Sequence, residues 1–134
     1  TLIVGYNTTF QRSSDLGRRM NQVFVGIPFG ILRRKLKYLC EMNGIRYVEQ
    51  EESYTSMASF WDLDEMPVYG EAGLVPPVFS GRRICRGLYQ DRSGRRINAD
   101  VNGALNIMRK CNIVSLRALY DRGDVDTPVR IRIA

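Results

Sequence analysis

The sequence contains no histidine, and this absence removes the commonest general base and metal ligand from the chemistry open to the chain. Serine–histidine and cysteine–histidine catalysis are therefore excluded within it. Cysteine is scarce: Cys40, Cys85 and Cys111 lie far apart and form no Cys-x-x-Cys pair, so no zinc-ribbon spacing exists. Nothing in this pattern demands a disulfide, and a reducing compartment is expected.

Long apolar runs are also missing, because no run approaches the ~18 residues of a spanning helix. No signal peptide opens the chain, since Thr1 leads straight into the apolar residues 2–4. We therefore expect no membrane partner, and the abrupt start suggests a fragment cut near a strand. The length of 134 residues and the 44% hydrophobic content suit one compact domain with a core.

Lysine is rare: seventeen of the 20 basic residues are arginine, against 14 acidic residues, giving a net charge of +6. A basic excess favours polyanionic partners, and arginine suits bidentate contacts with phosphate. Simple solubility is the alternative explanation.

The first third of the chain is typical of an α/β unit. Residues 2–4 and 45–50 are expected to be strands, and residues 7–21 a loop. A helix is expected from Pro28 to a stop at Asn43-Gly44. Its apolar stripe consists of Ile31, Leu32, Leu36, Leu39 and Cys40.

The middle of the chain divides by charge. Residues 57–81 carry no Lys or Arg and hold three prolines, which predicts an irregular insertion ordered by Phe60, Trp61 and Phe79. Residues 82–96 hold six arginines, and residues 91–94 have turn chemistry, which predicts a hairpin. The arginines are Arg82, Arg83, Arg86, Arg92, Arg95 and Arg96. They predict phosphate contacts, with Tyr89 stacking on a base, unless they only keep the hairpin soluble.

Residues 97–111 are expected to form a helix with Asn98 as N-cap. One face bears small or apolar residues below a carboxylate, which predicts close packing. This face comprises Asp100, Gly103, Ala104, Ile107, Met108 and Cys111. A carboxylate heading a buried stripe must be capped, paired or bound to metal. Favourable first-turn electrostatics is the alternative for Asp100. In the tail, residues 129–133 alternate like an edge strand.

Phosphodiester cleavage without histidine is possible where carboxylates converge on Mg²⁺. Asp100 at a helix start and Glu51 or Glu52 at a strand end are the candidates, since both positions can meet at one edge of an α/β sheet. The alternative for the two glutamates is a solvated strand end.

Several blocks, in this order, resemble the C-terminal part of OrfB/TnpB proteins. These are RNA-guided nucleases of bacterial insertion sequences, related to the type V CRISPR effectors. The blocks are residues 3–7, 16–29, 44–45, 51–56, 81–89 and 97–104. The resemblance implies an α/β fold, a partial RuvC-like (RNase H-type) domain with an irregular insertion and an arginine-rich hairpin. Its parts are residues 1–56, an insertion and hairpin at 57–96 in place of a zinc ribbon, a catalytic helix at 97–111, and a tail at 112–134.

The resemblance also implies Mg²⁺-dependent cleavage of DNA directed by a guide RNA, in the bacterial cytoplasm. Asp100 matches the last catalytic carboxylate of the family's Asp-x-Asn motif, and Asn102 matches the accompanying amide, taken here as a nucleic-acid contact. Gly5 stands where the family has its middle glutamate, so Glu52, or else Glu51, is the candidate to replace it.

Two further departures set the expectations for activity. The family's first catalytic aspartate has no counterpart here, so a missing N-terminal part should supply it and this chain alone should be inactive. The zinc-ribbon cysteines are also missing, so no zinc is expected. A non-catalytic nucleic-acid-binding remnant or repressor is the main alternative, and a basic α/β interaction module is a third.

Overall fold

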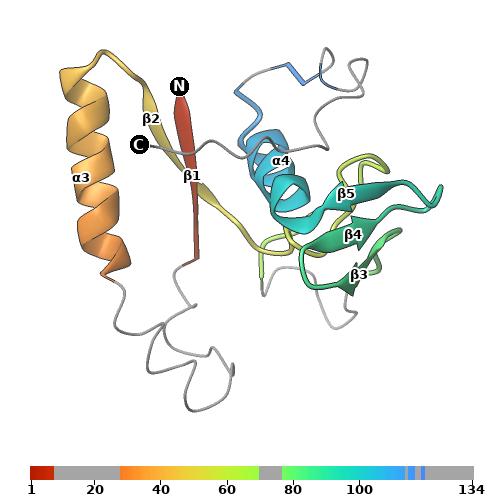
Figure 1. Cartoon of the computed structure of the whole chain (residues 1–134). Coiled ribbons are helices and arrows are strands. Elements are labelled where there is room, and N and C mark those ends of the chain that lie inside the picture. The colour runs from red at the N-terminus through yellow and green to blue at the C-terminus, as the bar shows by residue number, and fades with distance from the viewer. Residues whose placement is uncertain (8–27, 70–76, 114, 117–118, 120–134) are drawn as a thin grey trace, which may run out of the picture. The chain divides into compact units, whose positions relative to one another are not determined.

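The structure is a computed structural model, and it describes residues 1–7, 28–69, 77–113, 115–116 and 119. This part of the chain is mixed α/β, with two helices and two small sheets (Figure 1). The chain divides into two compact units, Thr1–Gln50 and Glu51–Ala134. The predicted α/β class is confirmed, whereas the RuvC-like topology stays a prediction. Residues 8–21 of the loop expected at 7–21, and the strand expected at 129–133, lie outside the described residues.

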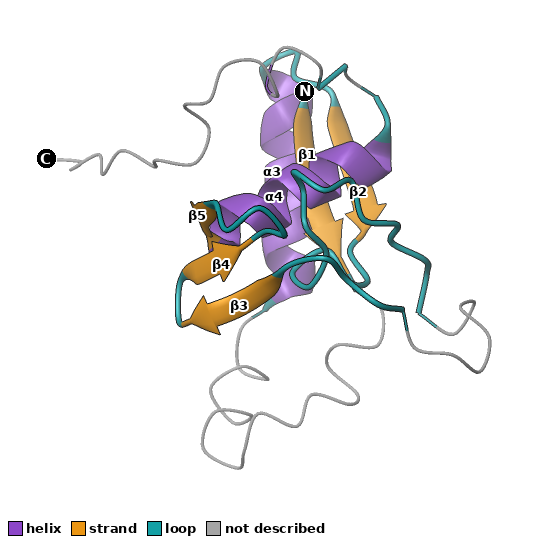
Figure 2. Ribbon diagram, turned by 90° about the vertical axis from the view of Figure 1, so that its right-hand side faces the viewer, coloured by secondary structure: helices purple, strands orange, loops and turns teal. Residues whose placement is uncertain are grey.

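The first unit contains the predicted strand–loop–helix–strand order. Strand β1 (Leu2–Tyr6) pairs with β2 (Tyr47–Glu51), and helix α3 (Phe29–Met42) lies between them in the chain. Both arrows point the same way in Figure 2, so the pair is parallel, as a helical crossover requires. Strand β1 extends past the predicted residues 2–4 and includes Gly5.

Helix α3 begins and ends where the sequence predicts. The carbonyl of Pro28 accepts hydrogen bonds from the amides of Ile31 and Leu32, at 2.9 and 3.0 Å. At the other end Gly44 has φ +63°, and the amide of Ile45 donates to the carbonyl of Cys40 at 2.8 Å. This is the Schellman closure that a left-handed glycine permits.

Helix α3 does not bury the apolar stripe that the sequence predicts for it. Cys40 is buried, but Ile31, Leu32 and Leu39 are about half exposed. The helix instead contacts the strands through Arg33. Its guanidinium pairs with Glu49 of β2 at 3.1 Å and lies over the ring of Tyr6 of β1, 4.8 Å from the centroid.

The second unit contains a three-stranded antiparallel sheet followed directly by a helix. Strands β3 (Arg82–Cys85), β4 (Leu88–Gln90) and β5 (Arg96–Asn98) lie in chain order, and α4 (Ala99–Cys111) begins where β5 ends (Figure 1). The predicted hairpin is confirmed as β4 and β5, and β3 adds a third strand to it. Within the described residues no helix is long and apolar enough to cross a bilayer.

The core of this unit forms between the sheet, α4 and the predicted insertion. Its buried members are Phe60, Tyr89, Ile97, Ala99, Leu105 and Leu116. Phe60 has no exposed surface, and Trp61 packs edge-on against it with ring centroids 5.2 Å apart. The described part of residues 57–81 consists of turns and irregular segments, so the predicted character of this region is confirmed there.

Helix α4 has the predicted cap but buries a different face. The Asn98 side chain accepts hydrogen bonds from the amides of Asp100 and Val101, at 2.9 and 3.1 Å, which confirms the N-cap. Asp100 and Ala104 are exposed, and a Cβ on Gly103 would meet nothing within 4 Å. The buried residues are Ala99, Asn102, Leu105 and Asn106. The close packing predicted below Asp100 is therefore wrong at Gly103 and Ala104, although Met108 of the same predicted face does pack against the core.

Candidate nucleic-acid interface and carboxylate site

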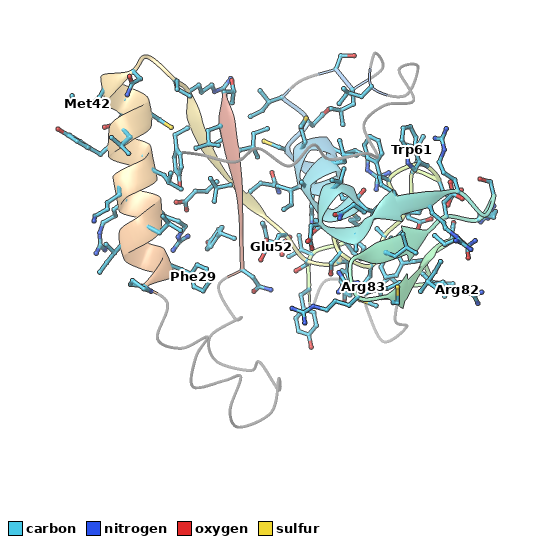
Figure 3. All side chains as sticks on the ribbon, in the orientation of Figure 1. Phe29, Met42, Glu52, Trp61, Arg82 and Arg83 are labelled. Atoms are coloured by element: carbon cyan, nitrogen blue, oxygen red, sulfur yellow. The ribbon has the colours of Figure 1, made fainter. Side chains whose placement is uncertain are left out.

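Two arginines and a glutamine form one row across the three-stranded sheet. Arg82 of β3 is paired with Gln90 of β4, and Gln90 is paired with Arg96 of β5. Residues directly opposite each other in a sheet point to the same face. Both arginines are exposed, so this row places two guanidinium groups on the solvent face. Arg82 is labelled in Figure 3.

The next row faces the core. Tyr89 and Ile97 are paired and are 1% and 2% exposed, and Arg83 on the edge strand β3 is their partner in register. The Tyr89 hydroxyl donates to the carbonyl of Met57 at 2.8 Å. Burial raises the pKa of Tyr89 to about 12, and nearby carboxylates add to the shift. The prediction that Tyr89 stacks on a base is wrong, because its ring belongs to the core.

All six arginines of residues 82–96 are exposed, but they differ in their contacts. Arg95 lies over the Trp61 ring at 4.4 Å, and the Arg92 guanidinium donates to the Ser80 hydroxyl at 3.1 Å. The other four arginines form no ion pair within the described part of the chain. These are Arg82, Arg83, Arg86 and Arg96. These four guanidinium groups are available to an anionic ligand.

The turn that joins β4 to β5 is held by Asp91. Its carboxylate accepts hydrogen bonds from the Ser93 hydroxyl and the Arg95 amide, both at 2.8 Å, and it is 8% exposed. Gly94 supplies the positive φ, +89°, that this turn requires. The turn chemistry predicted at residues 91–94 is confirmed, and Asp91 acts inside the turn rather than as a site carboxylate.

Two carboxylates of the acidic insertion also serve as internal acceptors. Asp64 accepts hydrogen bonds from the amides of Ser59 and Ser80, at 2.8 and 2.9 Å, and from the Ser80 hydroxyl at 2.5 Å. Burial raises the pKa of Asp64, but these bonds and the charge of Arg109 outweigh it, so the pKa is lowered. Asp62 accepts a bond from the Arg92 amide at 3.0 Å. Both therefore order the insertion against its neighbours.

The neighbouring glutamates at the end of β2 have different environments. Glu51 accepts hydrogen bonds from the Ser53 amide at 2.6 Å and from the Lys110 ammonium of α4 at 2.5 Å. Lys110 also donates to the Ser53 carbonyl at 3.2 Å. Burial raises the pKa of Glu51, but the bonds from Lys110 and Ser53 outweigh it, so the pKa is lowered. Glu51 therefore ties the strand end to α4 as an ion-paired carboxylate.

Glu52, which is labelled in Figure 3, is in contrast partly buried, and no described residue donates a hydrogen bond to its carboxylate. Burial raises the pKa of Glu52, and the charge of Glu51 raises it further. An added cation would relieve this cost. Of the two candidates that the sequence leaves open, Glu52 is the one with a free carboxylate.

Asp100 lies in the first turn of α4 with its side chain exposed. Its backbone amide is bound by Asn98, while its carboxylate receives no hydrogen bond from any described residue. Among the described residues no group of three or more acidic, cysteine or histidine side chains is arranged to hold a metal ion. Asp100, Glu51 and Glu52 are thus not brought together as a three-carboxylate site.

Two asparagines of α4 hold the turn that follows Glu52. Asn102 accepts from the Phe60 amide at 3.1 Å and donates to the Ala58 carbonyl at 2.8 Å. Asn106 donates to the same Ala58 carbonyl at 2.7 Å and to the Thr55 carbonyl at 2.9 Å. Both side chains have no exposed surface.

The prediction of Asn102 as a nucleic-acid contact does not fit this burial, because the oxygen and the nitrogen of its side-chain amide are both hydrogen-bonded to backbone groups. Sequence reasoning missed the part that Asn106 plays. A signal for it exists, since Asn102 and Asn106 are spaced i and i+4 and share a helix face with Ala99 and Leu105.

A comparison with protein-family models identifies the family. The model of the Cas12f1-like, TNB domain matches residues 29–107, more than half of the chain. Searches of curated proteins and of solved structures gave no match. The chain therefore belongs to the Cas12f1-like TNB family, which places it among the TnpB- and Cas12-related RNA-guided nucleases and implies interaction with nucleic acid.

Proposed function

We propose that this member of the Cas12f1-like TNB family acts within a RuvC-like nuclease that cleaves DNA with Mg²⁺, and that Glu52 and Asp100 are ligands of the metal. The observation that carries the proposal is the contrast between two neighbours. Glu51 is bound by Lys110, whereas Glu52 is partly buried with no donor from the described residues. An uncompensated carboxylate that burial holds at a raised pKa is typical of a functional site.

The carboxylates of Glu52 and Asp100 are the kind of ligand that Mg²⁺ binds. Magnesium prefers carboxylate oxygens and water, and it commonly takes only one or two carboxylates from the protein. Glu52 and Asp100 would supply these, and water or substrate phosphate would complete the coordination. When bound, the ion would activate water and stabilise the leaving oxygen. The proposal includes no zinc ion.

The arginine-bearing sheet would hold nucleic-acid backbone. Arg82 and Arg96 flank Gln90 on one face, and guanidinium groups make bidentate contacts with phosphate. In RNA-guided recognition, base pairing with the guide reads the sequence and the protein holds backbone. We therefore propose guide RNA and DNA as partners, in the bacterial cytoplasm.

The test is cleavage of target DNA by the complete protein with its guide RNA and Mg²⁺. Glu52→Gln and Asp100→Asn should each reduce the rate by roughly 100-fold or more, the usual loss when one group that stabilises transition-state charge is removed. Glu65→Gln is the matched control, because Glu65 is an exposed glutamate of the same unit. A Glu52→Gln variant that cuts at the wild-type rate would falsify the assignment of Glu52.

A second candidate function is binding of nucleic acid without cleavage. The absence of a three-carboxylate group among the described residues favours it. In that case Glu52→Gln and Asp100→Asn leave an already inactive protein unchanged, whereas replacing Arg82 and Arg96 with Gln weakens binding and flattens its dependence on salt.

A further inference from the structure

Polar side chains of α4 hold the segment that follows β2 at three successive points. Asn102, Asn106 and Lys110 are spaced four residues apart along one side of the helix, and each forms hydrogen bonds to the segment 51–60. The two asparagines bind neutral backbone groups, whereas Lys110 also binds a carboxylate. The third contact therefore brings a positive charge to the end of the segment where the two glutamates lie.

The Lys110 ammonium has a hydrogen-bond acceptor for each of its three hydrogens. It donates to the Glu51 carboxylate at 2.5 Å, to the Ser53 carbonyl at 3.2 Å and to the Pro67 carbonyl at 3.4 Å. Its side chain is only 12% exposed. A charge this buried depends on its partner, because removing one member of such a pair leaves the other uncompensated.

The contact with Lys110 also completes the hydrogen bonding of Glu51. One carboxylate oxygen, Oε1, accepts from the Ser53 amide at 2.6 Å, and the other, Oε2, is bound by Lys110. Glu52 accepts no hydrogen bond from any described residue. Of two carboxylates that are adjacent in the chain, only one therefore has oxygens left for a cation.

Without Lys110, both glutamates would attract the same cation. An additional carboxylate raises the affinity of a site for a divalent ion, because ligand charge sets that affinity. It also allows the ion a second position, and a displacement of about 1 Å at a reacting centre can slow a reaction about 100-fold. The ion pair between Lys110 and Glu51 would prevent this competition.

We propose that Lys110 is a positioning residue that withdraws Glu51 and leaves Glu52 as the single glutamate ligand of the cation. The inference rests on the proposed function and deepens it, since it names the group that selects between two neighbouring carboxylates. In this role Lys110 contacts neither the cation nor the substrate and acts through Glu51.

The experiment measures cleavage by the complete protein with its guide RNA over a range of Mg²⁺ concentrations. Lys110→Met removes the charge and should lower the maximal rate roughly tenfold or more. It should also lower the half-saturating Mg²⁺ concentration about fivefold, because a positive charge near the ion is lost. Lys110→Arg keeps the charge and should restore both values. Lys37→Met is the matched control, because Lys37 is an exposed lysine of α3.

A second substitution separates positioning from support of the fold. The double variant with Lys110→Met and Glu51→Gln removes the competing charge but does not restore the ion pair with α4. It should recover most of the wild-type rate if Lys110 acts by withdrawing Glu51. If Lys110 only supports the fold, the double variant should be as slow as Lys110→Met.

Binding of Mn²⁺ gives a readout that does not depend on cleavage. The complete protein without guide RNA is titrated with Mn²⁺ as a probe of the cation site, and free Mn²⁺ is measured by electron paramagnetic resonance. Lys110→Met should bind Mn²⁺ about fivefold more tightly, and Glu52→Gln should bind it more weakly. Unchanged or weaker binding by Lys110→Met would contradict the inference, because simple loss of structure weakens binding and cleavage together.

The outcomes separate the positioning role from the proposed function. If the double variant stays as slow as Lys110→Met while Glu52→Gln is still defective, the positioning role is overturned and the proposed function stands. If Glu52→Gln retains the wild-type rate and Mn²⁺ affinity, the proposed function fails together with the inference. Urea unfolding checks the fold of each variant, and Lys110→Gln, which can still donate to the Ser53 carbonyl, replaces Lys110→Met if that variant is unfolded.

Discussion

Gly81 lies immediately before β3, where the chain passes over the ring of Tyr89. A Cβ at this position would be 2.6 Å from the Gln90 carbonyl oxygen, and 2.6 Å from both Cε1 and the hydroxyl oxygen of Tyr89. Ordinary contacts of a Cβ begin at 3.4 Å. Gly81→Ala must therefore move two neighbours by several tenths of an ångström.

Neither neighbour can yield easily. The Gln90 backbone is paired with Arg82 on one side and Arg96 on the other, so its carbonyl is fixed within the sheet. The Tyr89 ring is 1% exposed and its hydroxyl is bound to the Met57 carbonyl. Overpacking a rigid site costs about 1–3 kcal/mol, and we expect about 3 kcal/mol here. For a chain of this size that lowers the melting temperature by roughly 10 °C.

The assay is urea and thermal unfolding of Gly81→Ala beside Gly103→Ala. The control makes the same chemical change in α4, where a Cβ meets nothing within 4 Å, so alanine should stabilise the helix by about 0.5–1 kcal/mol. Opposite signs for the two variants are expected. A Gly81→Ala protein with the unfolding midpoint of the wild type would refute the close approach of residue 81 to Tyr89.

Two further predictions concern buried polar groups. Asn102→Ala should lower the free energy of unfolding in urea by about 2 kcal/mol, and by more than Asn106→Ala, because it leaves the Phe60 amide without its acceptor. At pH 7, Glu51→Gln should destabilise the fold and Glu52→Gln should stabilise it, since their pKa values are lowered and raised from 4.5. The Glu52 difference should shrink as the pH falls towards 4.5, and the Glu51 difference should persist further down, until the pH falls through its lowered folded-state pKa. Equal signs at pH 7 would contradict this.

The regular elements follow from local signals and could be predicted. Pro28 and Gly44 bound α3 as expected, Asn98 caps α4, and residues 91–94 form the turn between β4 and β5. In each case the information lies within a few residues. Strand β3 was missed as a separate element because its solvent-exposed residues carry no alternation of polar and apolar side chains.

Which side of an element is buried depends on distant partners, and there the prediction fails. A hydrophobicity pattern assigns asparagine to solvent, yet Asn102 and Asn106 are fully buried. They are buried because they satisfy backbone groups of a turn more than 40 residues earlier in the chain. The residues near α4 in the sequence give no sign of that distant turn. The prediction therefore took the helix face that begins at Asp100 as the buried one.

The candidate site could be narrowed only once the contacts of each polar group were known. The chain uses many of its carboxylates and amides internally: Asp64 and Asp91 order turns, and Glu51 pairs with Lys110. Each gains a donor that repays the loss of water. Glu52 gains none from the described residues, and burial raises its pKa, so folding alone does not explain a carboxylate there. A glutamine would serve the fold at least as well, which supports the proposal that Glu52 binds a cation.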